Sequence, residues 1–312
     1  MTTFLKTKGK ADKLSSLISL LCILMLPFLL FFSNEIKAGV ITGIDLSFRN
    51  IIPTLFPFFI LADLWTSVIQ TNGKSLLGRI FERLFGVSSV ALPAFILGSV
   101  CGFPLGISVG TNLYKADRIT KSELETLCVF SNNPSAAFVI SGIGIGLYGD
   151  IKLGILLYSA VIISAILIGI ASKNRNCIST ISAVISRQSF NLVESIKKAG
   201  ISSLTVSVYI IFFSSIVSLT SSIMKNDIAT LIFACFFEVA NASKSAASLS
   251  KNNIFFALIT TAFALGFSGF SVHMQSFSIL PKKISRRKYL GMKLLQGMIC
   301  AAFLALYLIF AK

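Results

Sequence analysis

Residues 92–146 read LPAFILGSVCGFPLGISVGTNLYKADRITKSELETLCVFSNNPSAAFVISGIGIG, and two helix-breaking clusters interrupt this apolar stretch. They are Gly-Phe-Pro at 102–104 and Ser-Asn-Asn-Pro at 131–134. Each cluster leaves backbone N–H and C=O groups without helical partners, and lipid cannot satisfy them. Such breaks are tolerated where the freed groups face protein or a water-filled cavity. Two of them, about 30 residues apart, therefore favour a binding site built from discontinuous helices.

The composition is that of a membrane protein. Hydrophobic residues make up 54% of the 312 residues and charged residues 13%, and the mean hydropathy is +0.85. Uncharged runs long enough to cross a hydrocarbon core of about 30 Å recur along the chain. We therefore expect an all-α, polytopic membrane protein without a sizeable soluble domain.

The net charge of +16 does not indicate a nucleic-acid partner. The Lys and Arg residues gather in short loops between apolar segments, as positive-inside topology requires. Nucleic-acid binding would need a continuous basic face, which this pattern cannot build.

No motif indicates an enzyme, a metal site or a cofactor. The chain has no G-x-S-x-G elbow, no H-E-x-x-H and no Walker loop. Its six cysteines form no C-x-x-C pair, so we expect small buried apolar residues rather than disulfides or metal ligands. The run GIGIG at 142–146 is typical of close helix packing.

The order of apolar segments and helix breaks predicts that the chain divides into five segments. They are an N-terminal helix with an interfacial segment (1–50), a first repeat (51–172), a basic cytoplasmic loop (173–199), a second, inverted repeat (200–281) and a C-terminal helix (282–312). The first helix, 14–32, is long for a signal peptide and lacks a cleavage site after it, so we expect it to stay uncleaved with a cytoplasmic N-terminus.

Each repeat is expected to contain a re-entrant hairpin followed by a broken helix. The hairpins are predicted at 88–121 and 228–251, and the broken spans at 122–147 and 254–280. Cys101 lies 30 residues before Ser131, and Glu238 lies 30 residues before Ser268. Most of the 28 Lys and Arg residues fall in cytoplasmic segments if the two hairpins enter from opposite sides, so spacing and charge both favour an inverted repeat.

Hairpin tips and helix breaks of this kind bring four helix ends together near the membrane midplane. Half-helix N-termini carry partial positive charge and unpaired N–H groups that suit carboxylates or phosphates. Alternatively, the Asn and Ser side chains only satisfy one another across the breaks. The candidate substrate-binding residues are Gly102, Phe103, Pro104, Asn132, Asn133, Ser135, Glu238, Asn241, Ser268, Gly269, Ser271 and His273.

Three ionisable residues have more than one interpretation. Glu238 would repel an anion unless it is protonated, binds a cation or pairs with Lys244. His273, the only histidine, is either a proton-coupling group or a neutral, hydrogen-bonded side chain. Asp63 is either a functional intramembrane carboxylate or a group that caps or pairs with a neighbouring helix.

Five motifs, in this order, resemble the sporulation integral membrane protein YlbJ family. They are PTLFPFFILADLW (53–65), GFPLG (102–106), SNNPSAAF (131–138), EVAN (238–241) and GFSGFSVHMQ (266–275). That family lies within the nucleoside-recognition Gate group, whose architecture is related to that of concentrative nucleoside transporters. The resemblance covers roughly residues 51–280.

The resemblance implies a spore-forming Gram-positive source and a transporter of dipicolinic acid, a small aromatic dicarboxylate, across the outer forespore membrane. It matches Glu238 and Asn241 to a polar pair at the second hairpin, and Gly269 and Ser271 to the broken helix facing it. Two departures stand out: the chain is short, and Ala242-Ser243 replaces an expected glycine.

The partners expected are a small anion and the lipid bilayer; a coupling ion (H+ or Na+) and a homo-oligomer stay open. The alternatives are a nucleoside or other small-solute transporter of the same architecture, or a non-transporting spore-envelope scaffold. A scaffold would tolerate loss of the polar residues at both breaks.

The charge pattern predicts that the N-terminus and residues 173–198 lie together on the cytoplasmic face, because both are rich in Lys and Arg. Reporter fusions or cysteine accessibility at the two segments measure this directly. Placement of the two on opposite faces would contradict the inverted repeat.

Overall fold

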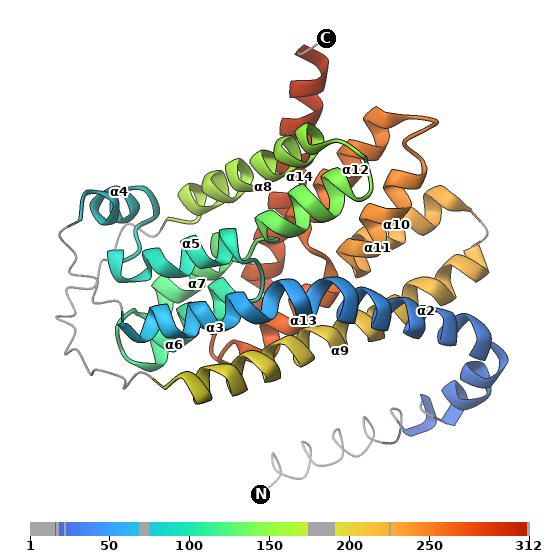
Figure 1. Ribbon diagram of the computed structural model, residues 1–312, viewed down its shortest axis with the longest axis horizontal. Coiled ribbons are helices and arrows are strands. Elements are labelled where there is room, and N and C mark those ends of the chain that lie inside the picture. The colour runs from blue at the N-terminus through green and yellow to red at the C-terminus, as the bar shows by residue number, and fades with distance from the viewer. Residues whose placement is uncertain are drawn as a thin grey trace, which may run out of the picture.

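Every regular element of the described chain is helical, as predicted. The computed structural model describes Ser16 and residues 19–21, 23–68, 75–173, 191–224 and 226–310 (Figure 1). The predicted first helix and the basic loop 173–199 lie partly outside these residues. The elements are α2 (Ser33–Leu46), η1 (Ser47–Ile51), α3 (Ile52–Val68), α4 (Leu76–Phe85), η2 (Ser89–Ala91), α5 (Leu92–Val100), α6 (Leu105–Lys115), α7 (Lys121–Ser131), η3 (Ala137–Ile145), α8 (Ile151–Ala171), α9 (Leu192–Met224), α10 (Asp227–Phe237), α11 (Val239–Ser248), α12 (Ile254–Phe267), α13 (Gly269–Ile279) and α14 (Arg286–Phe310).

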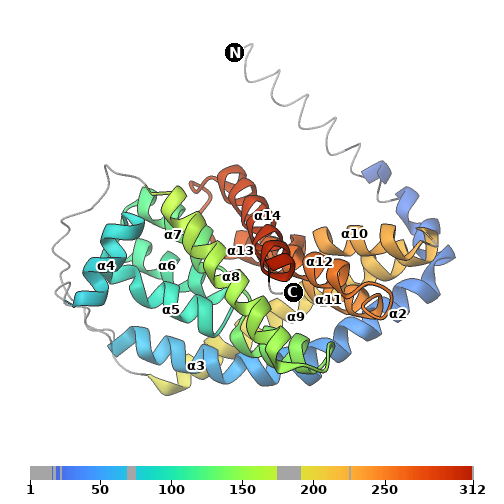
Figure 2. The same cartoon turned by 90° about the horizontal axis from the view of Figure 1, so that it is seen from above.

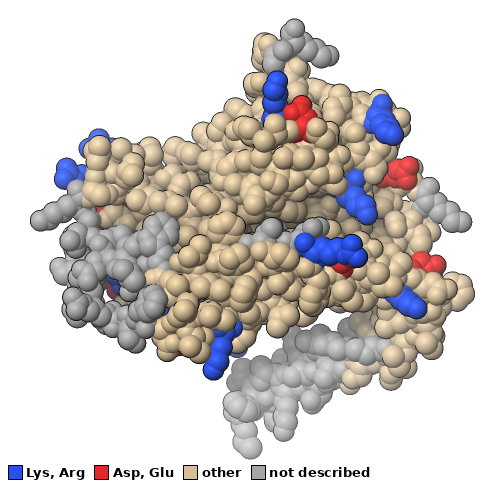
Figure 3. Space-filling model, in the orientation of Figure 1, with Lys and Arg blue, Asp and Glu red and all other residues tan. Residues whose placement is uncertain are grey.

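Several of these helices are long and apolar enough to cross a membrane. Four qualify in the described part: Ile151–Ala171, Leu192–Met224, Ile254–Ile279 and Arg286–Phe310. Counting each of two sharply bent helix pairs as one span raises the number to six. The face of the molecule in Figure 3 carries few charged side chains, as contact with lipid requires. The chain is a multi-pass membrane protein.

Residues 35–50, which we expected to form an interfacial segment, are helical and continue into α3 without a break. This long helix lies antiparallel to α9 (Figure 1). Gly39 and Gly43 explain the pairing, because a Cβ on either would lie 2.6 Å from a backbone Cα of α9, that of Ser215 or Ile211. Two glycines four residues apart let helix backbones approach this closely.

The stretch before the first hairpin forms a helix as well, α4. Phe81 and Phe85 on one side of α4 are buried, whereas another side exposes Leu76, Leu77, Ile80 and Leu84. This second apolar face is typical of a helix that lies in the membrane interface.

Helix α14 lies between the two halves of the chain. In Figures 1 and 2, α4 to α8 occupy one side of it and α10 to α12 the other. It contacts α12 on the second side and α7 and α8 on the first. The last helix, which we placed outside both repeats, therefore connects them.

The packing of α2 on α9 yields a stability test. Gly43→Ala should lower the free energy of unfolding by about 1–3 kcal/mol, because the new methyl group would overlap the Ile211 backbone. SDS-induced unfolding in mixed micelles measures the change.

Gly200→Ala on α9 is the matched control, since a Cβ there meets no atom within 4 Å. It should be neutral or slightly stabilising, as alanine favours helix. Equal effects of the two substitutions would show that the close approach at Gly43 is unimportant.

Candidate functional site

The tip of the first hairpin, α5–α6, lies directly against the break between α7 and η3. A Cβ on Gly98 would sit 1.9 Å from the Ser131 carbonyl oxygen, and one on Gly106 would sit 2.1 Å from it. Gly102, at φ +89°, has its Cβ position 2.7 Å from the Ser135 backbone nitrogen. Only glycine lets the hairpin backbone reach the broken helix.

The second half repeats this contact between α10–α11 and the break after α12. Helix α12 ends at Phe267, Ser268 adopts φ +74°, and α13 begins at Gly269. The Cβ position of Gly269 lies 3.2 Å from the Phe237 oxygen and 3.3 Å from the Glu238 nitrogen. The order of elements and the contact of tip with break therefore recur, while the inverted orientation of the two halves stays a prediction.

Glu238 holds the second tip by hydrogen bonds. It is 1% exposed, and its Oε2 accepts from the backbone N–H of Asn241 at 2.7 Å and from the Asn241 side-chain amide at 2.9 Å. The same amide donates to Ser214 of α9 at 2.9 Å. Lys244 is exposed and forms no ion pair with Glu238, which excludes one of the three alternatives for this carboxyl group; Glu238 instead caps the start of α11.

The two asparagines of the first break contact α13 and α14. Asn132 Nδ2 donates to Ser276 Oγ at 3.0 Å and to the Tyr289 hydroxyl at 2.7 Å. Asn133 Nδ2 donates to the Phe130 carbonyl at 2.8 Å. Both asparagines are completely buried. The second-half helix α13 thereby reaches the break of the first half.

Lys293 and Gln296 of α14 complete the first break, and sequence analysis missed both. Lys293 Nζ donates to the Asn132 carbonyl at 2.8 Å and to Gln296 Oε1 at 2.6 Å, and Gln296 Nε2 donates to Asn133 Oδ1 at 2.9 Å. The available signal was an isolated lysine inside the last apolar span, because a charge within a span suggests function.

His273 lies one turn into α13, fully buried among aromatic rings. Its ring centroid is 4.7 Å from that of Phe267 and 5.4 Å from that of Tyr289, both edge to face. Within the described residues neither ring nitrogen has a hydrogen-bond partner. The expected neutral, hydrogen-bonded histidine is therefore not seen, because α13 packs it against rings rather than acceptors.

The remaining candidates lie at the same breaks. Ser135 Oγ accepts from the Phe138 N–H at 3.1 Å, and Ser271 Oγ accepts from Gln275 Nε2 at 3.4 Å. Pro104 is buried in the first tip, and Phe103 beside it packs against a hydrophobic core to which both halves contribute. The structure thus gathers the predicted residues at two tip-and-break contacts that α13 and α14 join.

Comparison with known proteins supports the resemblance. The chain is 26% identical over 310 residues to the sporulation integral membrane protein YlbJ of Bacillus subtilis (strain 168), covering 85% of this chain and 76% of that protein. The chain is similar to YlbJ. No family model matches it, and no solved structure matches it.

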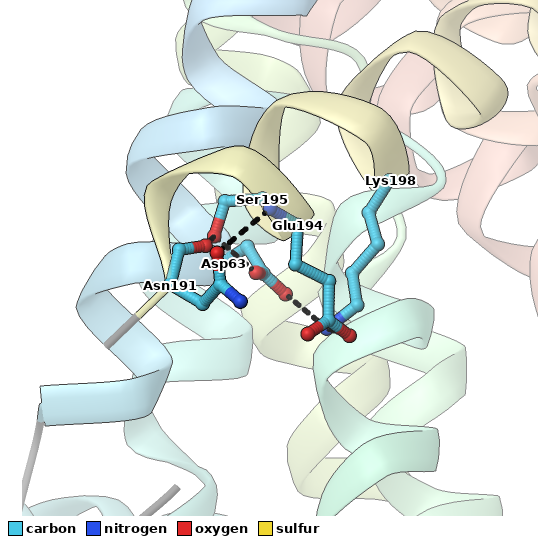
Figure 4. A network of polar contacts seen from close by, with 5 residues as sticks. All are labelled: Asp63, Asn191, Glu194, Ser195 and Lys198. Atoms are coloured by element: carbon cyan, nitrogen blue, oxygen red, sulfur yellow. Dashed lines mark hydrogen bonds and ion pairs between the residues drawn. The ribbon is translucent and has the colours of Figure 1, made fainter. Parts of the chain in front are cut away.

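Asp63, within the first motif of the resemblance to the YlbJ family, contacts the start of α9 (Figure 4). Its Oδ2 accepts from Ser195 Oγ at 2.6 Å, and its Oδ1 lies 3.8 Å from Lys198 Nζ, which also pairs with Glu194 at 3.0 Å. Asp63 therefore joins the end of α3 to the start of α9, in agreement with the pairing alternative.

The capping role of Glu238 predicts that different substitutions of this residue lower the stability by different amounts. Glu238→Ala should lower the free energy of unfolding by about 0.5–2 kcal/mol, because it removes the acceptor for the Asn241 N–H. Glu238→Gln keeps an acceptor oxygen and should cost less. Thermal unfolding of the purified protein in detergent measures both.

The exposed Lys244→Ala is the control and should be silent. A Glu238→Ala protein as stable as the wild type would show that the Glu238 cap contributes nothing to the stability of the turn.

Proposed function

We propose that this chain is a sporulation membrane transporter that moves dipicolinic acid, a small aromatic dicarboxylate, across the outer forespore membrane. The name of its relative YlbJ supports the sporulation setting. The observation that carries transport is the pair of broken helices, each held by a hairpin tip and each bordered by buried polar side chains.

The helix ends at these breaks suit an anionic solute. Ser268 makes no side-chain capping bond at the start of α13, so the partial positive charge of that terminus is not offset by a side chain. The start of α11 differs, because the Glu238 carboxylate caps it. A carboxylate would therefore be attracted to α13 and to the first break, where Lys293 lies.

The arrangement also suits alternating access. The first tip meets its break through glycines and backbone atoms, whereas the second adds ring contacts of Phe236 with Phe267 and of Phe237 with Phe270. A contact of glycine with backbone can separate as one repeat rocks against the other. In this proposal the chain carries out no chemical conversion of the solute.

The polar groups of the first break are expected to be essential. Asn132→Leu with Asn133→Leu should abolish uptake of dipicolinate by proteoliposomes, because leucine keeps the volume but removes the amide groups that bond Tyr289 and Gln296. Gel filtration and thermal unfolding check folding separately, since unpaired buried groups cost about 1–3 kcal/mol each.

Asn112→Leu with Asn252→Leu, two exposed amides, is the matched control and should transport normally. Uptake of a nucleoside instead of dipicolinate would favour the general solute transporter. Normal uptake by the double variant of the break would mean that the break is only structural. Normal dipicolinate content in spores of a deletion strain would refute the sporulation role.

A further inference from the structure

Helix α14 carries a lysine with no exposed surface, Lys293. The atoms that its ammonium group bonds, the Asn132 carbonyl and Gln296 Oε1, are both uncharged. None of the ion pairs among the described residues includes Lys293. Burying an ammonium ion without a counter-charge is costly. An ammonium group also has three donors, so one remains after these two bonds.

Unsatisfied polar atoms lie around this lysine. Among the described residues, Asn132 Oδ1 is buried without a hydrogen-bond partner, as are both ring nitrogens of His273. His273 packs edge to face on the Tyr289 ring. Tyr289 is four residues before Lys293, on the same face of α14, and its hydroxyl bonds Asn132. Buried polar groups rarely go unpaired in proteins, so several beside one lysine indicate a ligand.

Aromatic rings border the same place. The ring centroids of Phe267 and His273 are 4.7 Å apart, and those of His273 and Tyr289 are 5.4 Å apart. Phe270 is 6.0 Å from His273. A planar aromatic solute could pack against these rings while a carboxylate on it meets the ammonium group.

We propose that Lys293 is the counter-charge for a carboxylate of the transported solute, with Asn132 and His273 beside it. This inference rests on the proposed function and names the residue that would meet a carboxylate of its solute. Because Lys293 is completely enclosed, the solute reaches it only when the hairpin tip and the broken helix separate.

The test compares wild type with Lys293→Met in the purified full chain. Dipicolinate should raise the unfolding temperature of the wild type and not that of the variant, and proteoliposome uptake should fall at least tenfold. Lys288→Gln, an exposed lysine near the start of α14, is the control and should stay within twofold of the wild type. The neutral diamide of dipicolinate should stabilise neither protein.

The outcomes separate the two proposals. Equal uptake and stabilisation in wild type and a folded Lys293→Met would overturn the counter-charge and leave transport standing. If inorganic phosphate or chloride stabilises the wild type through Lys293 but dipicolinate is not taken up, the counter-charge stands and dipicolinate transport fails. Absence of any response of the wild type to all three anions would overturn both.

A second variant covers the case in which Lys293→Met does not fold. Asn132→Asp places a carboxylate beside Lys293 at almost unchanged volume, and its oxygens can accept from the Ser276 and Tyr289 hydroxyls. It should raise the unfolding temperature without solute and abolish the stabilisation by dipicolinate. Undiminished stabilisation by dipicolinate would overturn the inference.

Discussion

A helix that stops inside a membrane must give its free N–H and C=O groups to something other than lipid. This requirement acts at two breaks here, after Ser131 and after Phe267. At the first, the freed carbonyls of Phe130 and Asn132 accept from Asn133 and Lys293. The hairpin tips close over both breaks, and the glycines at their contacts follow from the same requirement, because a side chain would hold the tip away.

The position of α14 turns two similar halves into one site. Its buried face presents Tyr289, Lys293 and Gln296 to the asparagines of the first break. Through Asn132 and Ser276 the same face meets α13, which belongs to the second half. A break in one half is thereby bonded to a helix of the other half, and the proposed alternating access would use this link.

Both hairpin tips pack closely on a broken helix, but the charged groups at the two contacts differ. The second places a carboxylate, Glu238, on the start of α11 and bonds it to Asn241. The first tip has no charged residue, and the break that it covers receives Lys293 from α14. The Glu238 carboxylate caps a helix, whereas Lys293 forms no ion pair among the described residues. This difference is the basis for proposing an anion at the first break.

The amino-acid sequence by itself determined the all-helical, multi-pass class, the hairpins and the positions of the breaks. These depend on hydropathy and on local rules for glycine, proline and asparagine, which act over a few residues. It also identified Asn132, Asn133 and Glu238, because polar groups within apolar runs are conspicuous. It did not show that residues 35–50 form a helix on α9, because that helix is stabilised by close approach to a partner about 170 residues away. The sequence also did not predict that Lys293 lies at the first break, or that His273 packs against aromatic rings without a hydrogen bond. Those outcomes depend on where α14 and α13 pack, and only the tertiary structure decides which side chains meet across helices distant in the chain.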